Sequence, residues 1–199
     1  MKDLDQKAFL KIVYYLTHFD GDYTYQEKEI FEDFYQQYAK QDRSKIITEQ
    51  KAIIAKQDIM DECNASIREI KTNARDKGDF YNLFIEKIDE ELNSHKKFFT
   101  VRAFTYNKNI NAKVAIWNLV LIASIDGFSK DEHLIIDHIA RKLKIQKDEV
   151  FEIENRVFAY QAIENEEKFL RKQDVPNKRQ RLRELRRRKE ILTKSVIPL

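Results

Sequence analysis

The chain has 199 residues, of which 42% are hydrophobic and 36% charged, and its formal net charge is +3. It contains three glycines and two prolines, far below the roughly 12% of an average composition. Sandwiches and barrels need frequent turn residues, so this scarcity excludes an all-β fold and predicts an all-α one. The single cysteine, Cys63, excludes an internal disulfide and a cysteine-based zinc site. Because the sequence has neither a long apolar run nor a signal-peptide pattern, we expect no transmembrane segment and a cytoplasmic location.

Apolar residues recur at helical spacing through most of the chain. We expect helices over residues 3–18, 27–39, 44–74 (one long helix or two), 80–97 with Asp79 as N-cap, 112–125, 129–143, 147–160 with a helical continuation to about 173, and 177–195. The segment 112–125, AKVAIWNLVLIASI, is hydrophobic nearly all round. We therefore expect it at the centre of a helical bundle.

Two segments of the chain, residues 9–34 and 115–139, resemble each other. Each is an apolar helix that ends in Asp-Gly and continues with a capping box, in which a hydroxyl and a carboxylate satisfy N–H groups at a helix start. The matched residues are Asp20, Gly21, Thr24 and Glu27 in the first segment, and Asp126, Gly127, Ser129 and Glu132 in the second. The repeat predicts two helical hairpins of one design, related by a pseudo-twofold axis.

A helical hairpin needs the glycine and the capping box, but it does not need the aspartate before the glycine. An acidic side chain at a helix C-terminus costs about 0.3–1 kcal/mol, so its presence in both segments points to a shared task. Divalent cation binding is the candidate, with oxygen ligands drawn from Asp20, Asp22, Glu27, Asp126 and Glu132. An EF-hand is excluded because apolar and imidazole side chains would occupy its first and third ligand positions. The alternative is that both motifs serve only to build the hairpins.

The motifs DGDYTYQE (20–27) and IDGFSKDE (125–132) resemble the TerB-like tellurite-resistance family, and the resemblance continues through EHLIIDHIARKLKIQKDEVFEI (132–153). It covers roughly residues 5–40 and 110–160. The resemblance implies an all-helical bundle with two pseudo-symmetric halves. It also implies a non-enzymatic module connected with metal or oxyanion stress and with membrane-associated assemblies. A site for a divalent cation (Ca²⁺, Mg²⁺ or Mn²⁺) would then include Asp20, Glu27, Asp126 and Glu132.

We expect two regions on this basis. Residues 1–170 would form the TerB-like helical domain, with repeat one at 5–40, a helical insertion at 41–108 and repeat two at 110–160. Residues 171–199 would form a basic C-terminal helix. That region has eleven Lys and Arg against three acidic residues, a charge of +8, so the remainder carries −5. The insertion and the basic helix are departures from the family's pattern.

The basic helix has a narrow apolar seam of Leu182, Leu185, Ile191 and Leu192, and arginines cover the rest of its surface. The candidate partner-binding residues are Arg179, Arg181, Arg183, Arg186, Arg187 and Arg188. They could contact nucleic acid, an anionic membrane surface, an acidic protein or the acidic body of this same chain. The helix lacks the aromatic side chains that stack on bases, which disfavours single-stranded nucleic acid.

Two hypotheses for the function follow. The first is a non-enzymatic TerB-like stress-response and interaction module that binds a protein partner, and a divalent cation through the paired Asp-Gly loops. The alternative is an adaptor whose basic C-terminal helix binds nucleic acid or an acidic protein, with the bundle as its scaffold. No spacing of Ser, His, Cys or acidic residues predicts an enzyme.

Overall fold

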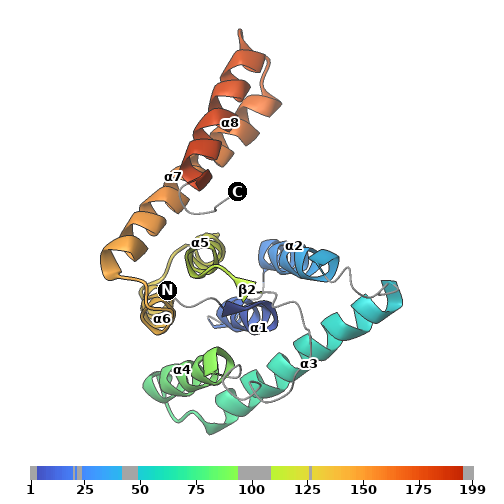
Figure 1. The fold of residues 1–199 in the computed structure, drawn as a ribbon, viewed down its shortest axis with the longest axis vertical. Coiled ribbons are helices and arrows are strands. Elements are labelled where there is room, and N and C mark those ends of the chain that lie inside the picture. Colours follow the sequence, from blue (N-terminus) through green and yellow to red (C-terminus); the bar gives the residue numbers. More distant parts are fainter. Residues whose placement is uncertain are drawn as a thin grey trace.

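A computed structural model describes residues 4–19, 21, 24–41, 49–93, 109–125 and 127–194. In these ranges the chain is almost entirely helical, which confirms the all-α prediction (Figure 1). The helices are α1 (Gln6–Leu16), α2 (Tyr25–Gln41), α3 (Glu49–Asn73), α4 (Lys77–Asn93), α5 (Ala112–Ala123), α6 (Lys130–Lys142), α7 (Lys147–Lys172) and α8 (Lys178–Lys194). No helix in this part of the chain is long and apolar enough to cross a membrane.

Helix α1 lies in the middle of the bundle and packs against α2, α3, α4 and α5. All of its residues from Ala8 to Leu16 are buried. They include Lys11, whose ammonium donates hydrogen bonds to Glu62 on α3 and Glu91 on α4. Helix α5 is buried as deeply, with Ile116, Leu119 and Val120 inaccessible to solvent. The central place predicted for α5 is therefore shared with α1.

A short pair of strands joins the starts of these two central helices. Strand β1 (Leu4–Asp5) precedes α1, β2 (Asn109–Ile110) precedes α5, and the two pair antiparallel with Leu4 opposite Ile110. Asp5 then caps α1 by accepting hydrogen bonds from the N–H groups of Lys7 and Ala8, at 2.8 and 3.0 Å. Asn111 caps α5 by accepting one from Lys113 at 2.9 Å. Both repeats thus begin with a strand, a side-chain cap and a buried helix.

Two boundaries differ from the sequence-based expectation. Asp79 is not the N-cap of α4, which begins two residues earlier at Lys77. Asp76 takes the capping position, because its Oδ1 accepts a hydrogen bond from the Asp79 N–H at 2.9 Å. The second difference is that α7 continues from Lys147 to Lys172 as one helix, where we expected a helix to 160 and a further stretch.

Helix α7 leaves the bundle halfway along its length. Its first half packs on α5 and α6, and its second half extends beyond them (Figure 1). Asn177, with a left-handed φ of 59°, reverses the chain, and α8 returns antiparallel along the projecting half of α7. The predicted basic helix is therefore one arm of a hairpin that stands out from the bundle.

Candidate functional site: the paired loops and the basic hairpin

The two predicted glycine turns have the backbone conformation that the repeat requires. Gly21 has a φ of +99° and Gly127 a φ of +122°, values that side-chain-bearing residues rarely adopt. An added Cβ would meet no atom within 4 Å at either position. Backbone conformation, and not crowding, therefore accounts for a glycine at each turn.

Both capping boxes are formed. The Glu27 Oε2 accepts a hydrogen bond from the Thr24 N–H at 2.7 Å, and the Thr24 Oγ1 accepts one from the Glu27 N–H at 3.2 Å. The corresponding distances between Ser129 and Glu132 are 2.9 and 3.1 Å. Both glutamates are buried, at 5% and 7% exposure. The two repeats thus share helix, turn, cap and helix.

The predicted cation ligands fall into two groups. Asp20, Asp22 and Asp126 lie outside the described residues. Glu27 and Glu132 are described, and each uses one carboxylate oxygen in its capping box. The described residues contain no group of three or more His, Cys, Asp or Glu side chains placed to hold a metal ion. Both glutamates are therefore engaged in their caps, and cation binding stays a prediction.

A buried carboxylate joins the two helices of the projecting hairpin. The carboxylate of Glu167 on α7 is almost fully buried and accepts hydrogen bonds from Arg171 at 2.6 Å and from Lys189 on α8 at 3.3 Å. Lys189 also donates to Glu164 at 2.8 Å, and its Nζ lies 4.9 Å from the centre of the Tyr160 ring. This is the distance of a cation–π contact. The chain's own acidic residues are thus one target of the basic helix.

These contacts shift the ionisation of both partners. The hydrogen bond from Arg171 holds the pKa of the Glu167 carboxyl below its ordinary value, although burial acts in the opposite direction. Burial alone would lower the pKa of the Lys189 ammonium, but Glu164, Tyr160 and Glu167 together raise it. Both groups therefore carry their full charge at neutral pH, and their attraction favours docking of α8 on α7.

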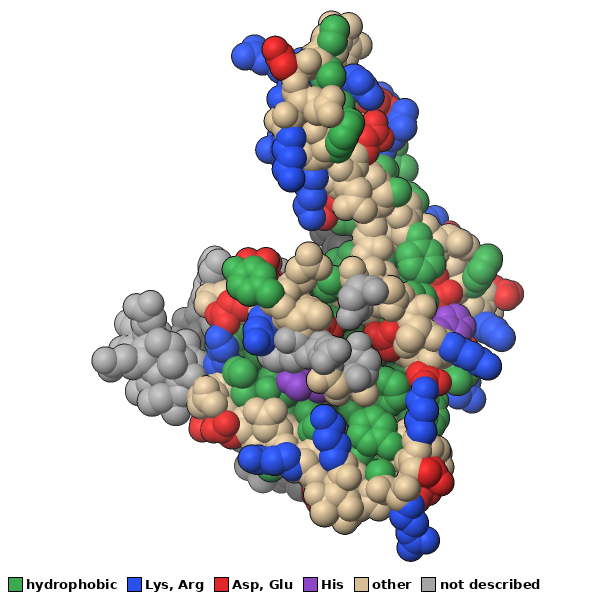
Figure 2. Space-filling model, turned by 180° about the vertical axis from the view of Figure 1, so that it is seen from behind, with side chains coloured by type: hydrophobic (Ala, Val, Ile, Leu, Met, Phe, Trp, Pro, Cys, Tyr) green, Lys and Arg blue, Asp and Glu red, His purple; other side chains and the backbone are tan. Residues whose placement is uncertain are grey.

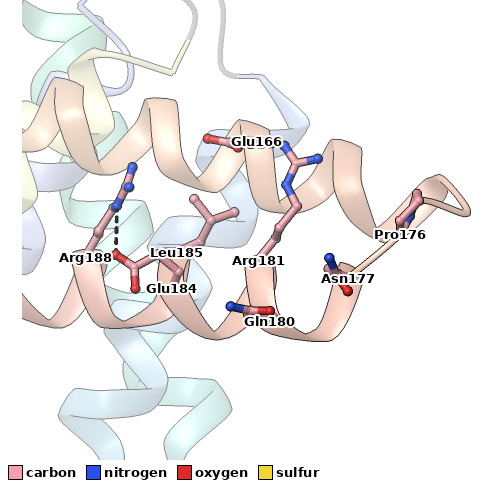
Figure 3. A pocket seen from close by; sticks show the side chains of 8 residues that line it. All are labelled: Glu166, Pro176, Asn177, Gln180, Arg181, Glu184, Leu185 and Arg188. Atoms are coloured by element: carbon pink, nitrogen blue, oxygen red, sulfur yellow. Dashed lines mark hydrogen bonds and ion pairs between the residues drawn. The ribbon is translucent and has the colours of Figure 1, made fainter.

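A shallow hollow of about 490 Å³ opens at the turn end of the hairpin, between Glu166 on α7 and the side chains of α8 (Figure 3). Its charged side chains pair with one another. Arg181 reaches toward Glu166 at 3.6 Å, and Arg188 lies 3.3 Å from Glu184. This hollow is consequently a mixed-charge surface, in which two of the predicted partner-binding arginines are engaged in ion pairs.

The six predicted partner-binding arginines have different surroundings. Arg181, Arg186 and Arg188 form ion pairs with Glu166, Glu167 and Glu184. The remaining three, Arg179, Arg183 and Arg187, are exposed, and no ion pair joins them to the part of the chain that the structure describes. They follow one another at intervals of four residues, so they form a row on one face of α8. We call these three residues the arginine row.

The arginine row lies on the side of α8 that turns away from α7. Leu185, the buried apolar contact of α8, is on the opposite side of the helix. Figure 2 shows Lys and Arg side chains along the flanks of the projecting hairpin. The prediction that Ile191 belongs to the apolar seam of α8 is wrong, because 60% of this residue is exposed. The docked face and the basic face of α8 are therefore separate.

The acidic half of this arrangement, Glu164 and Glu167, was not among the residues predicted from the sequence. Glu164 and Glu167 are one helical turn apart on α7, and both contact Lys189. The local signal was the acidic run ENEE at 164–167, shortly before a basic helix. A short turn between two helices of opposite charge is a pattern from which an electrostatically docked hairpin could have been predicted.

Comparison with models of known protein families finds no match for this chain. Comparisons with curated proteins and with solved structures find no match either. The resemblance to the TerB-like family therefore stays a hypothesis that rests on the two Asp-Gly motifs, and the function has to be argued from the geometry of the chain itself.

Proposed function

We propose that this protein is a non-enzymatic interaction module whose α7–α8 hairpin binds the phosphate backbone of a double-stranded nucleic acid. The observation that carries the proposal is the arginine row, Arg179, Arg183 and Arg187, exposed on a projecting helix without an ion-pair partner among the described residues. The proposal adopts the adaptor hypothesis of the sequence analysis and makes the bundle its scaffold.

The spacing of the row supports a phosphate ligand. Residues four apart on a helix are separated by about 6 Å along its axis, so the row spans about 12 Å. Guanidinium groups bind phosphate oxygens through two parallel hydrogen bonds, which makes arginine well suited to such contacts. The major groove of a duplex is wide enough to admit one α-helix. Because α8 lies at the edge of the molecule, a duplex could approach its outer face without meeting the bundle.

The family resemblance implies a pseudo-twofold relation and a cation site, and both would be features of the bundle that serves as the scaffold. A pseudo-twofold relation between the two repeats is supported by the antiparallel pairing of β1 with β2, since a twofold axis between the repeats would produce such a pair. A cation at the loops depends on Asp20 and Asp126, which lie outside the described residues. The proposed contact with nucleic acid needs neither feature.

The test is binding of a fluorescently labelled duplex, measured by anisotropy at low salt. The variant Arg179→Gln/Arg183→Gln/Arg187→Gln should bind about tenfold or more weakly than the native chain, because three phosphate contacts are lost. A matched control is Arg68→Gln/Lys71→Gln/Lys130→Gln, which removes three exposed cations from the bundle. The control changes the net charge equally and should bind nearly as the native chain does.

Two results would contradict the proposal. Equal losses in both triple variants would mean that net charge alone attracts the duplex. Stronger binding of an acidic polypeptide, such as polyglutamate, than of the duplex through the same three arginines would assign the row to a protein partner instead.

A further inference from the structure

A second surface of the hairpin carries no part of the proposed function. Phe151, Phe158 and Phe169 project from α7 with 65%, 40% and 59% of their surfaces exposed. They lie at i, i+7 and i+18, so all three point from the same side of the helix. Figure 2 shows hydrophobic side chains on the surface of the hairpin, among Lys and Arg side chains. Single exposed apolar residues need no explanation, but these three phenylalanines are aligned in a row along one side of α7.

The residues between the phenylalanines complete a regular pattern. On the side of α7 that carries the phenylalanines, six exposed positions follow one another at alternating intervals of four and three, and they are occupied by Phe151, Asn155, Phe158, Ala162, Asn165 and Phe169. Alternation of this kind is the contact pattern of one helix packed along another. An asparagine within such a contact fixes register and oligomeric state. We call these six residues the α7 seam.

No helix among the described residues covers the α7 seam. Helices α5 and α6 pack on the opposite side of α7, where Ile153 and Val157 are buried. Helix α8 packs further along α7, on nearly the same side as α5 and α6, through contacts to Glu164 and Glu167. The edge of Phe158 touches Phe128, with 5.8 Å between ring centres, and the other seam residues are exposed in the part of the chain that the structure describes. A helix from another molecule could therefore lie along it.

Charged residues flank the seam with opposite signs on its two sides. By helical position, the exposed acidic residues Asp148, Glu152 and Glu166 lie along one flank. The exposed basic residues Lys147, Lys168 and Lys172 lie along the other. Two of the acidic residues also pair within the chain, Glu152 with Arg156 and Glu166 with Arg181. An anionic membrane or a nucleic acid would meet one repulsive flank, whereas a second copy of this helix meets a complementary one.

We propose that two copies of this chain associate through their α7 seams, with the two α7 helices parallel and in register. A twofold axis parallel to the helices places the acidic flank of one copy beside the basic flank of the other. An antiparallel pair would place like charges side by side. The parallel pair brings Asn155 against its own symmetry mate, and it holds two basic hairpins in one assembly, where both could engage one extended ligand.

The size of the seam sets the strength of the dimer. Nineteen residues of helix extend about 28 Å, and one face of a helix is about 10 Å wide. This footprint is well below the roughly 800 Å² per partner of a standard interface. The dimer is therefore weak, and its population depends on concentration, in the micromolar range or above.

Sedimentation equilibrium on the full chain, from about 10 to 300 µM, tests the proposal. The native chain should change from monomer to dimer across this range. The variant Phe151→Glu/Phe169→Glu should raise the dimer dissociation constant by about tenfold or more, because it buries charge at both ends of the seam. The matched control is Ile191→Glu, at an apolar residue of α8 that is 60% exposed, and it should dimerise as the native chain does. Circular dichroism checks that each variant is folded.

A native chain that stays monomeric throughout, or a seam variant that dimerises normally, would overturn the proposal. A third result would also overturn it. If the native chain stays monomeric and binds vesicles of anionic lipid, and the seam variant loses that binding, the seam faces a membrane. Oxidative cross-linking tests the orientation. An Asn155→Cys variant should form a disulfide-linked dimer with itself, and the native Cys63 is buried and does not compete. Cross-links found only in a mixture of Asn155→Cys and Asn165→Cys chains would contradict the parallel arrangement.

Discussion

The glutamates that the two repeats share form hydrogen bonds with backbone N–H groups at the starts of helices. Glu27 and Glu132 are buried beside the N–H groups that they accept from, and each completes a box with a hydroxyl three residues earlier. A carboxylate at a helix start is also favoured by the helix dipole. Both buried carboxylates therefore serve as capping groups at the start of a helix.

This role predicts the effect of removing a cap. Ser129→Ala should lower the free energy of unfolding by about 0.5–2 kcal/mol, because the Glu132 N–H loses its acceptor. Urea denaturation followed by circular dichroism measures the change. The control is Thr72→Ala on the exposed side of α3, where the hydroxyl only donates back to the Arg68 carbonyl. An equal loss in both variants would mean that the box at Ser129 contributes no specific stability.

Residue-scale prediction from sequence succeeded where the chemistry is local. The capping boxes involve residues three apart, so their spacing is visible in the chain. The burial of Lys11 was not predictable in this way. Its partners Glu62 and Glu91 are 51 and 80 residues away and come from two other helices. The sequence around a lysine on an otherwise apolar helix face does not indicate which distant carboxylates will pair with it.

Helices α7 and α8 each use different sides for contacts within the chain and for the proposed contacts with other molecules. Helix α7 contacts α5 and α6 with its first half and α8 with its second half, on nearly the same side, and the seam lies on the other side. Helix α8 uses one side for α7 and the opposite side for the arginine row. Periodicity predicted these helices, but the path of α7 out of the bundle depends on which faces find partners, and this is decided by tertiary packing.

The hairpin should respond to pH through Glu167. Its pKa in the folded chain lies below the ordinary value of 4.5, because Arg171 and Lys189 stabilise the carboxylate. This contribution to stability is therefore full above pH 4.5 and is lost as the pH falls through the pKa of the folded state. Glu167→Gln should destabilise the protein at pH 7, and the difference from the native chain should shrink toward pH 3.

Urea denaturation at several pH values measures that difference. The control is Glu166→Gln, since Glu166 is an exposed neighbour that lies 3.6 Å from Arg181, and exposed pairs contribute little. A Glu167→Gln variant that is equally destabilised at pH 7 and pH 3 would show that the carboxylate charge does not hold the hairpin.

At the scale of the whole molecule, charge is divided between body and arm. The +8 of residues 171–199 and the −5 of the remainder are visible in the sequence. The sequence left open whether the basic helix contacts the acidic body of the same chain, and the turn that folds α8 back onto α7 pairs part of the basic charge with Glu167. The structure reduces six candidate arginines to a row of three that are exposed and unpaired among the described residues.

The most direct test of the central claim is the salt dependence of duplex binding. Each phosphate contact contributes about −0.9 to the slope of log K against log salt concentration. Replacing Arg179, Arg183 and Arg187 by Gln should therefore make the slope shallower by about 2.7, while the bundle control Arg68→Gln/Lys71→Gln/Lys130→Gln leaves it nearly unchanged. A slope that is the same in the native chain and in the arginine-row variant would contradict the account.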